Sequence, residues 1–185
     1  MVETAWHDNT TQDVDHEPAQ GNANALYCYA TQLAEVEVDT ETGVVEILRV
    51  VTATDAGKAI NPLNVEGQIE GGVSMGVGYA LSEEIRQEGG YLKTPALGEY
   101  LIPTSLDMPQ IESHIVEVPV STGPYGAKGI GEPAAIPTAP AVLNAIADAL
   151  GFRVTELPAS PENLLRLIRE KERQEKILPG QEGAP

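Results

Sequence analysis

The stretch AEVEVDTETGVVEILRVVTATD, residues 34–55, decides the fold because it encodes two strands and the turn between them. Before the turn, Ala34, Val36 and Val38 alternate with acidic residues, which is the period of a half-buried β-strand. The segment DTETG supplies a short turn whose glycine, Gly43, suits a positive φ. The β-branched residues that follow are typical of a second strand. The sequence therefore predicts a β-hairpin over residues 26–55.

The next segment, INPLNVEGQIEGGVSMGVGYALSEEIRQ (residues 60–87), predicts a long helix. Asn61 suits the N-cap and Pro62 the first helical position, where its missing N–H costs nothing. Every fourth residue forms one apolar ridge: Val65, Ile69, Val73, Val77, Leu81 and Ile85. Each glycine in this helix costs about 0.5–1 kcal/mol relative to alanine. We therefore expect other backbone or a ligand to approach it closely at Gly67, Gly71, Gly72, Gly76 and Gly78.

The rest of the chain predicts an α+β fold, with strand pairs packed against the glycine-rich helix and two later helices. We expect short strands and turns over residues 88–109, strands over 113–120 and 152–158, and a glycine-rich loop over 121–133. A helix follows Pro133 and ends at Gly151, a usual C-terminal glycine. The last helix starts at Ser160 and Pro161 and directs Leu164, Leu167 and Ile168 inward. Residues 1–24 are expected to be a polar arm, 25–172 one domain and 173–185 a flexible tail.

Composition excludes several classes of function. The net charge of −17, with eleven Lys and Arg residues, argues against binding nucleic acid, because phosphate contacts depend on cations. The single cysteine, Cys28, excludes an internal disulfide or a cysteine-based metal cage, and fits a reducing compartment. No apolar run is long enough for a membrane span, and the acidic start does not resemble a signal peptide. We therefore expect a cytoplasmic protein.

Familiar catalytic patterns are weak in this chain. The histidines His7, His16 and His114 have no spacing typical of metal ligands, so we expect no metal site formed by this chain alone. No serine lies in a GxSxG elbow. The glycine pattern of the long helix has no Walker lysine and does not follow a strand. Cys28 on its own indicates a small buried apolar residue.

Glu132, in KGIGEPAAIP (residues 128–137), is the strongest candidate for chemistry. One interpretation is a surface acid in a turn, favoured by the dipole of the following helix. The other depends on the glycines before it, which can bring backbone N–H groups against an anion or cofactor and hold the carboxylate as a general base. Gln68 and Glu70, next to the glycines of the long helix, also have two interpretations. They are either solvated, or Gln68 lays its amide along a polar cofactor.

Two segments together resemble a known family. VEGQIEGGVSMGVGYALSEEI, followed about sixty residues later by GAKGIGEPAAIPTAPAVLNAIADALG, resembles the C-terminal part of the molybdenum-binding subunit of the xanthine oxidase family. The family includes xanthine dehydrogenases, aldehyde oxidoreductases and aerobic carbon monoxide dehydrogenases. The resemblance runs from about residue 26 to residue 168 and includes the hairpin before the helix.

The resemblance implies a molybdenum hydroxylase that inserts oxygen derived from water. In the family a glutamate deprotonates the metal-bound hydroxyl, and Glu132 occupies its position. Cofactor contacts are implied for the matching glutamine and loop: Gln68, Gly126, Ala127, Lys128, Gly129, Ile130 and Gly131. The cofactor is molybdenum–molybdopterin, often a cytosine dinucleotide in bacterial members. Iron–sulfur clusters and FAD are expected on partner chains.

The chain also departs from the family. The family's subunit is several times longer, and its earlier cofactor loops and substrate arginine have no counterpart here. Two hypotheses therefore stay open: one component of a molybdenum hydroxylase that other chains complete, or a non-catalytic module that keeps the architecture. Purines, N-heterocycles, aldehydes and carbon monoxide all remain as substrates under the first hypothesis.

Overall fold

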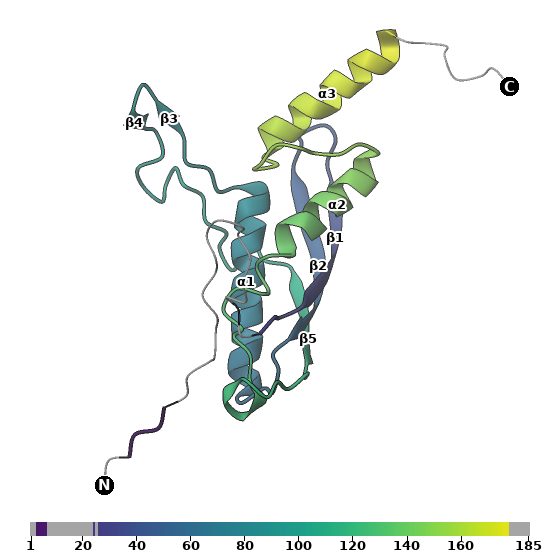
Figure 1. Cartoon of the computed structure of the whole chain (residues 1–185). Coiled ribbons are helices and arrows are strands. Elements are labelled where there is room, and N and C mark those ends of the chain that lie inside the picture. The colour runs from purple at the N-terminus through teal and green to yellow at the C-terminus, as the bar shows by residue number, and fades with distance from the viewer. Residues whose placement is uncertain (1–2, 7–23, 25, 178–185) are drawn as a thin grey trace, which may run out of the picture.

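A computed structural model describes residues 3–6, 24 and 26–177, and Figure 1 shows their arrangement. The fold is α+β, as predicted. The elements, in chain order, are β1 (Ala30–Val38), β2 (Val45–Asp55), α1 (Pro62–Leu81), β3 (Gln87–Glu88), β4 (Tyr91–Leu92), β5 (Gln110–Val116), the short 3-10 helix η1 (Pro124–Gly126), α2 (Thr138–Leu150) and α3 (Pro161–Ile177).

The predicted hairpin is confirmed. β1 and β2 pair antiparallel, with Ala30 opposite Thr54 and Val38 opposite Val45, and the register shifts once between Glu35 and Val36. In the turn, the N–H of Gly43 donates to the carbonyl of Asp39 over 2.7 Å, with φ +78° at the glycine. The Asp39 carboxylate also accepts from the backbone N–H of Glu41 at 2.8 Å, so the turn is held by its own first residue.

The third strand of this sheet is β5, which lies parallel to β2 and gives the order β1-β2-β5. A parallel pair needs a crossover between its strands, and α1 lies within that crossover. Because the strands are parallel, the ends of β2 and β5 meet, with Asp55 opposite Val116. The antiparallel β1 starts at this same edge. The loops that leave β2 and β5 and the segment that enters β1 are therefore neighbours.

Two helices cover one face of the sheet. α1 packs on β5, α2 packs on β1, and the two helices contact each other (Figure 1). The core between them contains four positions of the predicted α1 ridge: Val65, Ile69, Val73 and Val77. Asn61 caps α1 by accepting from the N–H of Asn64 at 3.2 Å. Leu164 and Ile168 of α3 are buried and Leu167 half-buried, as predicted.

The structure differs from the predictions at several element boundaries. Ile85 lies beyond the end of α1 and is exposed, because the helix ends at Leu81. α2 begins at Thr138, after a series of turns that follows Pro133. Residues 152–158, predicted to be a strand, pair with no strand among the described residues and have irregular backbone. β5 begins three residues earlier than predicted.

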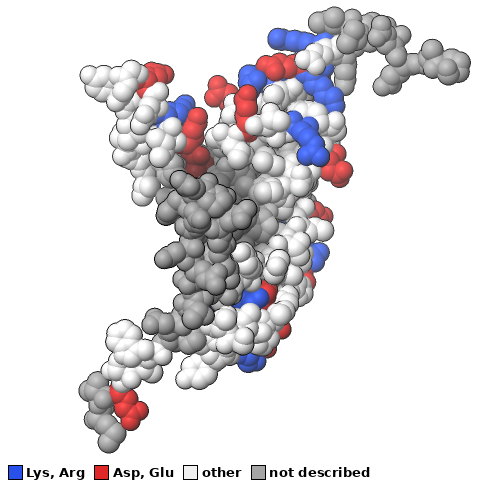
Figure 2. Space-filling model, viewed as in Figure 1, with Lys and Arg blue, Asp and Glu red and all other residues white. Residues whose placement is uncertain are grey.

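The termini are described only in part. Most of the predicted polar arm, residues 7–23, and the predicted tail from residue 178 onward lie outside the described residues. α3 reaches Ile177, so a helix occupies the first part of the segment predicted to be a tail. Among the described residues, no helix has the length and apolar character needed to cross a membrane. On the face seen in Figure 2, charged side chains gather over α3 and the adjacent body.

Candidate functional site

Glu132 lies exposed beside a cavity of about 560 Å³. Residues 26–30, which lead into β1, form one wall of this cavity, and Glu132, Pro133 and Ile136 belong to another. Residues 26–30 were not predicted to belong to the site. The hairpin register contained the signal, because it returns the start of β1 to the end of β2, the edge from which the Glu132 loop approaches.

The first half of the glycine-rich loop is hydrogen-bonded within the chain. The backbone N–H groups of Gly126, Ala127 and Lys128 donate to the carbonyls of Gly123, Pro124 and Ala56 over 2.9, 3.0 and 3.1 Å. Two glycines allow this crossing of loops: Gly126 has φ +83°, and a Cβ on Gly57 would lie 2.5 Å from the Gly126 oxygen. The backbone N–H groups of these three residues are therefore used in hydrogen bonds that hold the loop.

The second half of the loop has the opposite character. The N–H groups of Gly129, Ile130 and Gly131 donate to no other described residue, and the two glycines are exposed. The Ile130 side chain packs against the core and so holds this segment from below. Gln68, on α1, is exposed too, and a Cβ on Gly131 would lie 4.0 Å from its Nε2 atom. The fold thus brings Gln68 and the loop together.

Lys128 points away from this exposed segment. Its ammonium lies 2.5 Å from the Asp55 carboxylate and donates to the carbonyl of Tyr27 over 3.0 Å. The side chains of Lys128 and Asp55 are only 4% and 6% exposed. Burial alone would raise the pKa of Asp55, but hydrogen bonds from Lys128 and the N–H of Gly57, with the ammonium charge, outweigh burial and lower that pKa. A cofactor contact of Lys128 stays a prediction.

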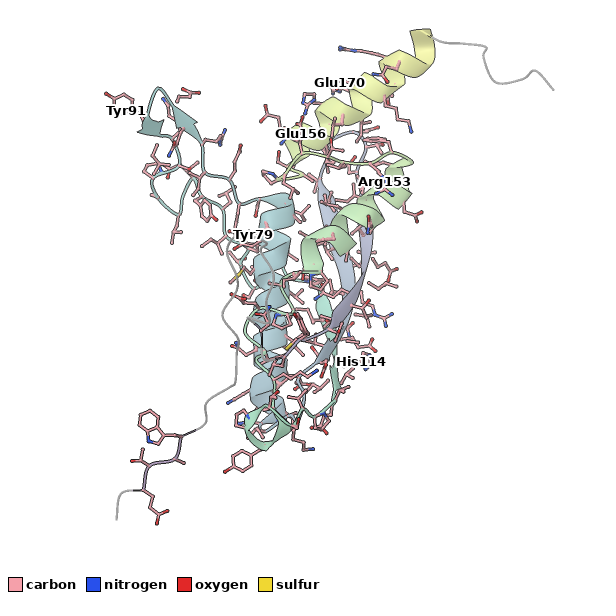
Figure 3. All side chains as sticks on the ribbon, viewed as in Figure 1. Tyr79, Tyr91, His114, Arg153, Glu156 and Glu170 are labelled. Carbon is pink, nitrogen blue, oxygen red and sulfur yellow. The ribbon has the colours of Figure 1, made fainter. Side chains whose placement is uncertain are left out.

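Two other titratable side chains, His114 and Cys28, were considered as candidates for chemistry. His114 projects from β5 (Figure 3), and its Nε2 lies 2.9 Å from a Glu112 carboxylate oxygen. Cys28 donates from its Sγ to the Gly129 carbonyl over 3.2 Å, and burial raises the pKa of its thiol against the lowering effect of the Lys128 charge. Within the described ranges, no cluster of three or more His, Cys, Asp or Glu side chains could hold a metal ion.

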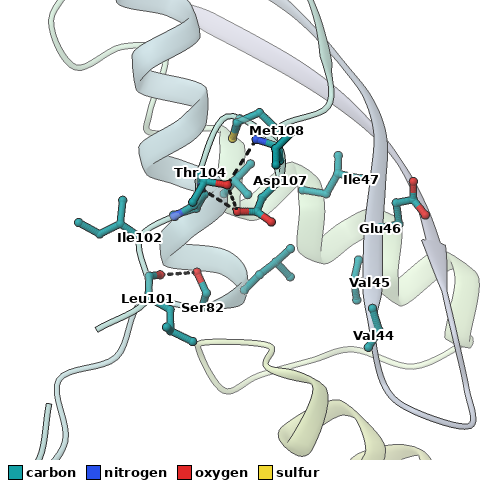
Figure 4. Close-up of a pocket in the computed structure, with 14 residues that line it drawn as sticks. Val44, Val45, Glu46, Ile47, Ser82, Leu101, Ile102, Thr104, Asp107 and Met108 are labelled. Atoms are coloured by element: carbon teal, nitrogen blue, oxygen red, sulfur yellow. Dashed lines mark hydrogen bonds between the residues drawn. The ribbon is translucent and has the colours of Figure 1, made fainter. Parts of the chain in front are cut away.

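A second cavity, of about 650 Å³, shares no residue with the Glu132 cavity. It lies between the start of β2, the end of α1 and residues 101–108 (Figure 4). Its walls are largely apolar, and hydrogen bonds between Thr104 and Asp107 and between Ser82 and Leu101 shape its rim. It lies at the opposite end of α1 from Gln68, and its carboxylates are those of Glu46 and Asp107.

Four of the five glycines of α1 form two contrasting pairs, and a Cβ on the fifth, Gly78, would overlap the Glu83 side chain. A Cβ on Gly72 would lie 2.9 Å from the Ala134 Cβ, and one on Gly76 would overlap the buried Thr138 side chain. Gly67 and Gly71, in contrast, face open space among the described residues. These two flank Gln68 and keep the helix surface next to the loop free of side chains. The open glycines, the free N–H donors and the amide of Gln68 form one surface suited to a large ligand that accepts hydrogen bonds.

Comparison with known proteins shows the family of the chain. A family model described as the molybdopterin cofactor-binding domain matches residues 1–109. The chain belongs to this family. The match includes α1 with Gln68, and it begins in the segment predicted to be an arm. The resemblance to the molybdenum-binding subunits of the xanthine oxidase family is thereby confirmed.

Relatives of the family extend the match beyond residue 109. A putative xanthine dehydrogenase molybdenum-binding subunit of Escherichia coli is 39% identical over 138 residues, which cover 74% of this chain and 18% of that protein. The nicotine 6-hydroxylase large subunit of Paenarthrobacter nicotinovorans is 42% identical over 138 residues, 72% of this chain and 17% of that protein. The solved aldehyde oxidoreductase from Desulfovibrio gigas superposes with a TM-score of 0.79 at 32% identity, over 86% of this chain and 17% of that one.

The chain spans less than a fifth of the length of these relatives. Its residues nevertheless fit the family's cofactor at the surface described above. The free donors of Gly129 and Gly131 and the amide of Gln68 match a ligand rich in hydrogen-bonding groups, and the open glycines leave room for its bulk. The Lys128 ammonium is paired with Asp55, so the groups that this surface offers to a ligand are neutral donors.

Proposed function

We propose that this chain is one part of a molybdenum hydroxylase and supplies the general base of its active site, Glu132. The observation that carries the proposal is the position of Glu132, exposed at the end of a loop whose N–H groups at residues 129–131 donate to no other described residue. That loop lies beside Gln68, in a chain of the molybdopterin-binding family. The alternative, a solvated acid in a turn, does not account for the preceding N–H groups, which have no described partner. Nor does it account for Gly67 and Gly71, which leave the adjacent surface of α1 open.

Gln68, Gly129, Ile130 and Gly131 would hold the cofactor through the Gln68 amide and the three backbone N–H groups. Gly126, Ala127 and Lys128 would contribute to the same surface by fixing the course of the loop. When bound, the molybdenum cofactor supplies the redox chemistry of a hydroxylation in which the inserted oxygen comes from water. In bacterial members the pterin is expected in its cytosine dinucleotide form.

Glu132 would accept a proton at its carboxylate during the reaction. A general base must reach the proton it removes and be ionised beforehand. Pro133 follows directly, and the carbonyl of Glu132 accepts from the N–H of Ala135 over 2.9 Å, so the backbone at the base is held by a turn. General-base catalysis typically contributes about 10²–10⁴-fold to the rate.

A hydroxylase of this family needs more than the residues of this chain. We infer that the chain works together with the remaining part of the molybdenum subunit and with iron–sulfur and flavin subunits, because it matches 18% and 17% of two relatives described as subunits. The substrate would be a small molecule with an electrophilic carbon, and the complex would lie in the cytoplasm. Co-purification with the natural neighbours and cofactor extraction test these statements.

The deciding experiment replaces the proposed base in the purified assembly. We expect Glu132→Gln to lower turnover on the order of 10²–10⁴-fold with molybdenum and pterin content unchanged, because the amide keeps the shape but accepts no proton. Glu88→Gln, at an exposed acid of β3, is the matched control and should retain full turnover. The activity panel covers purines, N-heterocycles, aldehydes and carbon monoxide.

The same preparation separates the two hypotheses. Normal turnover of Glu132→Gln would refute the assignment of the base. An assembly that contains neither molybdenum nor pterin would instead identify the chain as a non-catalytic module.

A further inference from the structure

A buried ion pair stands immediately before the exposed half of the loop. The Lys128 ammonium contacts the Asp55 carboxylate and the Tyr27 carbonyl, and its backbone N–H donates to Ala56. Asp55 is fixed in turn by the N–H groups of Gly57, over 2.9 Å, and Val118. The pair therefore joins the entry to β1, the end of β2, the segment after β5 and the loop itself.

The burial of this pair sets it apart from its neighbour. Lys58 and Glu117 form an ion pair of 2.9 Å close by, but their side chains are 51% and 38% exposed. An exposed pair constrains its side chains weakly, because water competes for both charges. A buried pair has no such alternative partner, so it tolerates little displacement of either charge. The buried pair can hold the backbone of Lys128 in one place, which the exposed pair cannot do for Lys58.

A second set of contacts holds the far side of the loop. The carbonyl of Ala134 accepts from the Nε2 of Gln32, on β1, over 2.7 Å and from the Oγ1 of Thr138, on α2, over 2.9 Å. Residues 129–133 thus lie between two fixed points, Lys128 and Ala134. Cys28 adds one contact between these points, from its Sγ to the Gly129 carbonyl.

We propose that Asp55 and Lys128 are positioning residues for Glu132, which fix where the loop leaves the body and so aim its free N–H groups and its carboxylate at the ligand. This inference rests on the proposed function for the role of Glu132. The claim that the ion pair fixes the position of the loop does not depend on the proposed function, because that position is set within the chain. Lys128 acts through the backbone that follows it, not through its own charge at the ligand.

The first test measures hydrogen exchange in the full chain, without cofactor. In Lys128→Met the amides of residues 126–128 should exchange roughly tenfold faster or more, because their hydrogen bonds lose the anchor that holds them. Lys58→Met is the matched control and should exchange like the wild type. Asp55→Asn/Lys128→Met removes both charges together and leaves no unpaired buried ion, so it serves if the single variant does not fold. It should show the same faster exchange.

A variant destabilised elsewhere separates positioning from general loosening. Val142→Ala truncates a fully buried residue of α2. If it accelerates exchange at residues 126–128 as much as Lys128→Met does, the effect is global and the proposal is wrong. Wild-type exchange in the double variant would overturn it equally.

The second test uses the purified assembly. The double variant should lower kcat on the order of tenfold to a hundredfold, with KM within about twofold and molybdenum content unchanged, because a displaced base slows the chemical step more than binding. Equal loss of kcat and of molybdenum would indicate a structural role only and would overturn the positioning role. If Glu132→Gln keeps full turnover while loop exchange still responds to Lys128, the proposed function fails and the anchoring geometry stands.

Discussion

Two pairs of glycines on one helix have opposite surroundings. Gly72 and Gly76 of α1 are packed so closely against the start of α2 that an added methyl group would meet Ala134 or Thr138. Gly67 and Gly71, on the same helix, face open space among the described residues. All four carry the same propensity cost in a helix. Among the described residues only the first pair gains packing in return, which is consistent with the ligand surface proposed beside the second pair.

The same division runs through the glycine-rich loop. Lys128 and the residues before it are hydrogen-bonded inside the chain, whereas the donors of Gly129 and Gly131 have no described partner. The first half of the loop is therefore hydrogen-bonded within the fold, and the second half presents N–H groups that no other described residue uses. Variants in the hydrogen-bonded half should therefore change the stability of the chain, whereas variants beside the other half should change the cofactor content of the assembly.

The largest change in stability is expected from a variant in the hydrogen-bonded half of the loop. Lys128→Met leaves Asp55 as a buried charge without its partner, which should lower the free energy of unfolding by about 3–5 kcal/mol. Urea unfolding of the full chain measures this value. Lys58→Met, in the exposed pair, should cost less than about 1 kcal/mol. Equal losses in the two variants would contradict the difference drawn between the buried and the exposed pair.

Gly76→Ala tests the packed pair of glycines. The added methyl group overlaps the buried Thr138 side chain, so the helices must move apart. Overpacking of this kind typically costs about 1–3 kcal/mol, which exceeds the gain in helix propensity. The urea midpoint should fall, and an unchanged or higher midpoint would show that α1 and α2 do not pack this closely.

Gly67→Ala should have the smallest effect on stability and the opposite sign. The methyl group meets nothing within the described chain, so the helix should gain about 0.5–1 kcal/mol from better propensity. In the purified assembly the same variant should lower molybdenum and pterin content, because it fills space beside Gln68. A stabilised chain with full cofactor content would show that nothing approaches α1 at this position.

Local patterns were sufficient for much of the fold. The alternation before Gly43, the cap at Asn61 and the ridge from Val65 to Val77 predicted the hairpin and α1, because each depends on neighbours within a few residues. The predictions failed where that local signal was ambiguous. Ile85 continues the spacing of the ridge, yet α1 ends at Leu81, where the N–H of Ser82 still bonds to Gly78 and the chain then departs. The apolar letters of residues 152–158 suited a strand, but no described strand lies beside them.

The candidate site divides in the same way. Glu132, Gln68 and the glycines were found from the sequence through a resemblance of motifs, and the fold brings Gln68 and Gly131 into proximity. The direction of Lys128 was not predictable, because its partner Asp55 lies 73 residues away at the end of another strand. Residues 26–30 were missed for the same reason.

The sequence by itself determined the hairpin, the helices, the family and the choice of Glu132 as the proposed base, since periodicity, caps and motifs are properties of adjacent residues. Only the tertiary structure decided which glycines are packed and which are open, and which half of the loop is free to bind. Those outcomes depend on contacts between segments far apart in the chain. The sequence does not show whether the Lys128 ammonium is paired inside the fold or exposed to a ligand, because its partner Asp55 is distant in the chain.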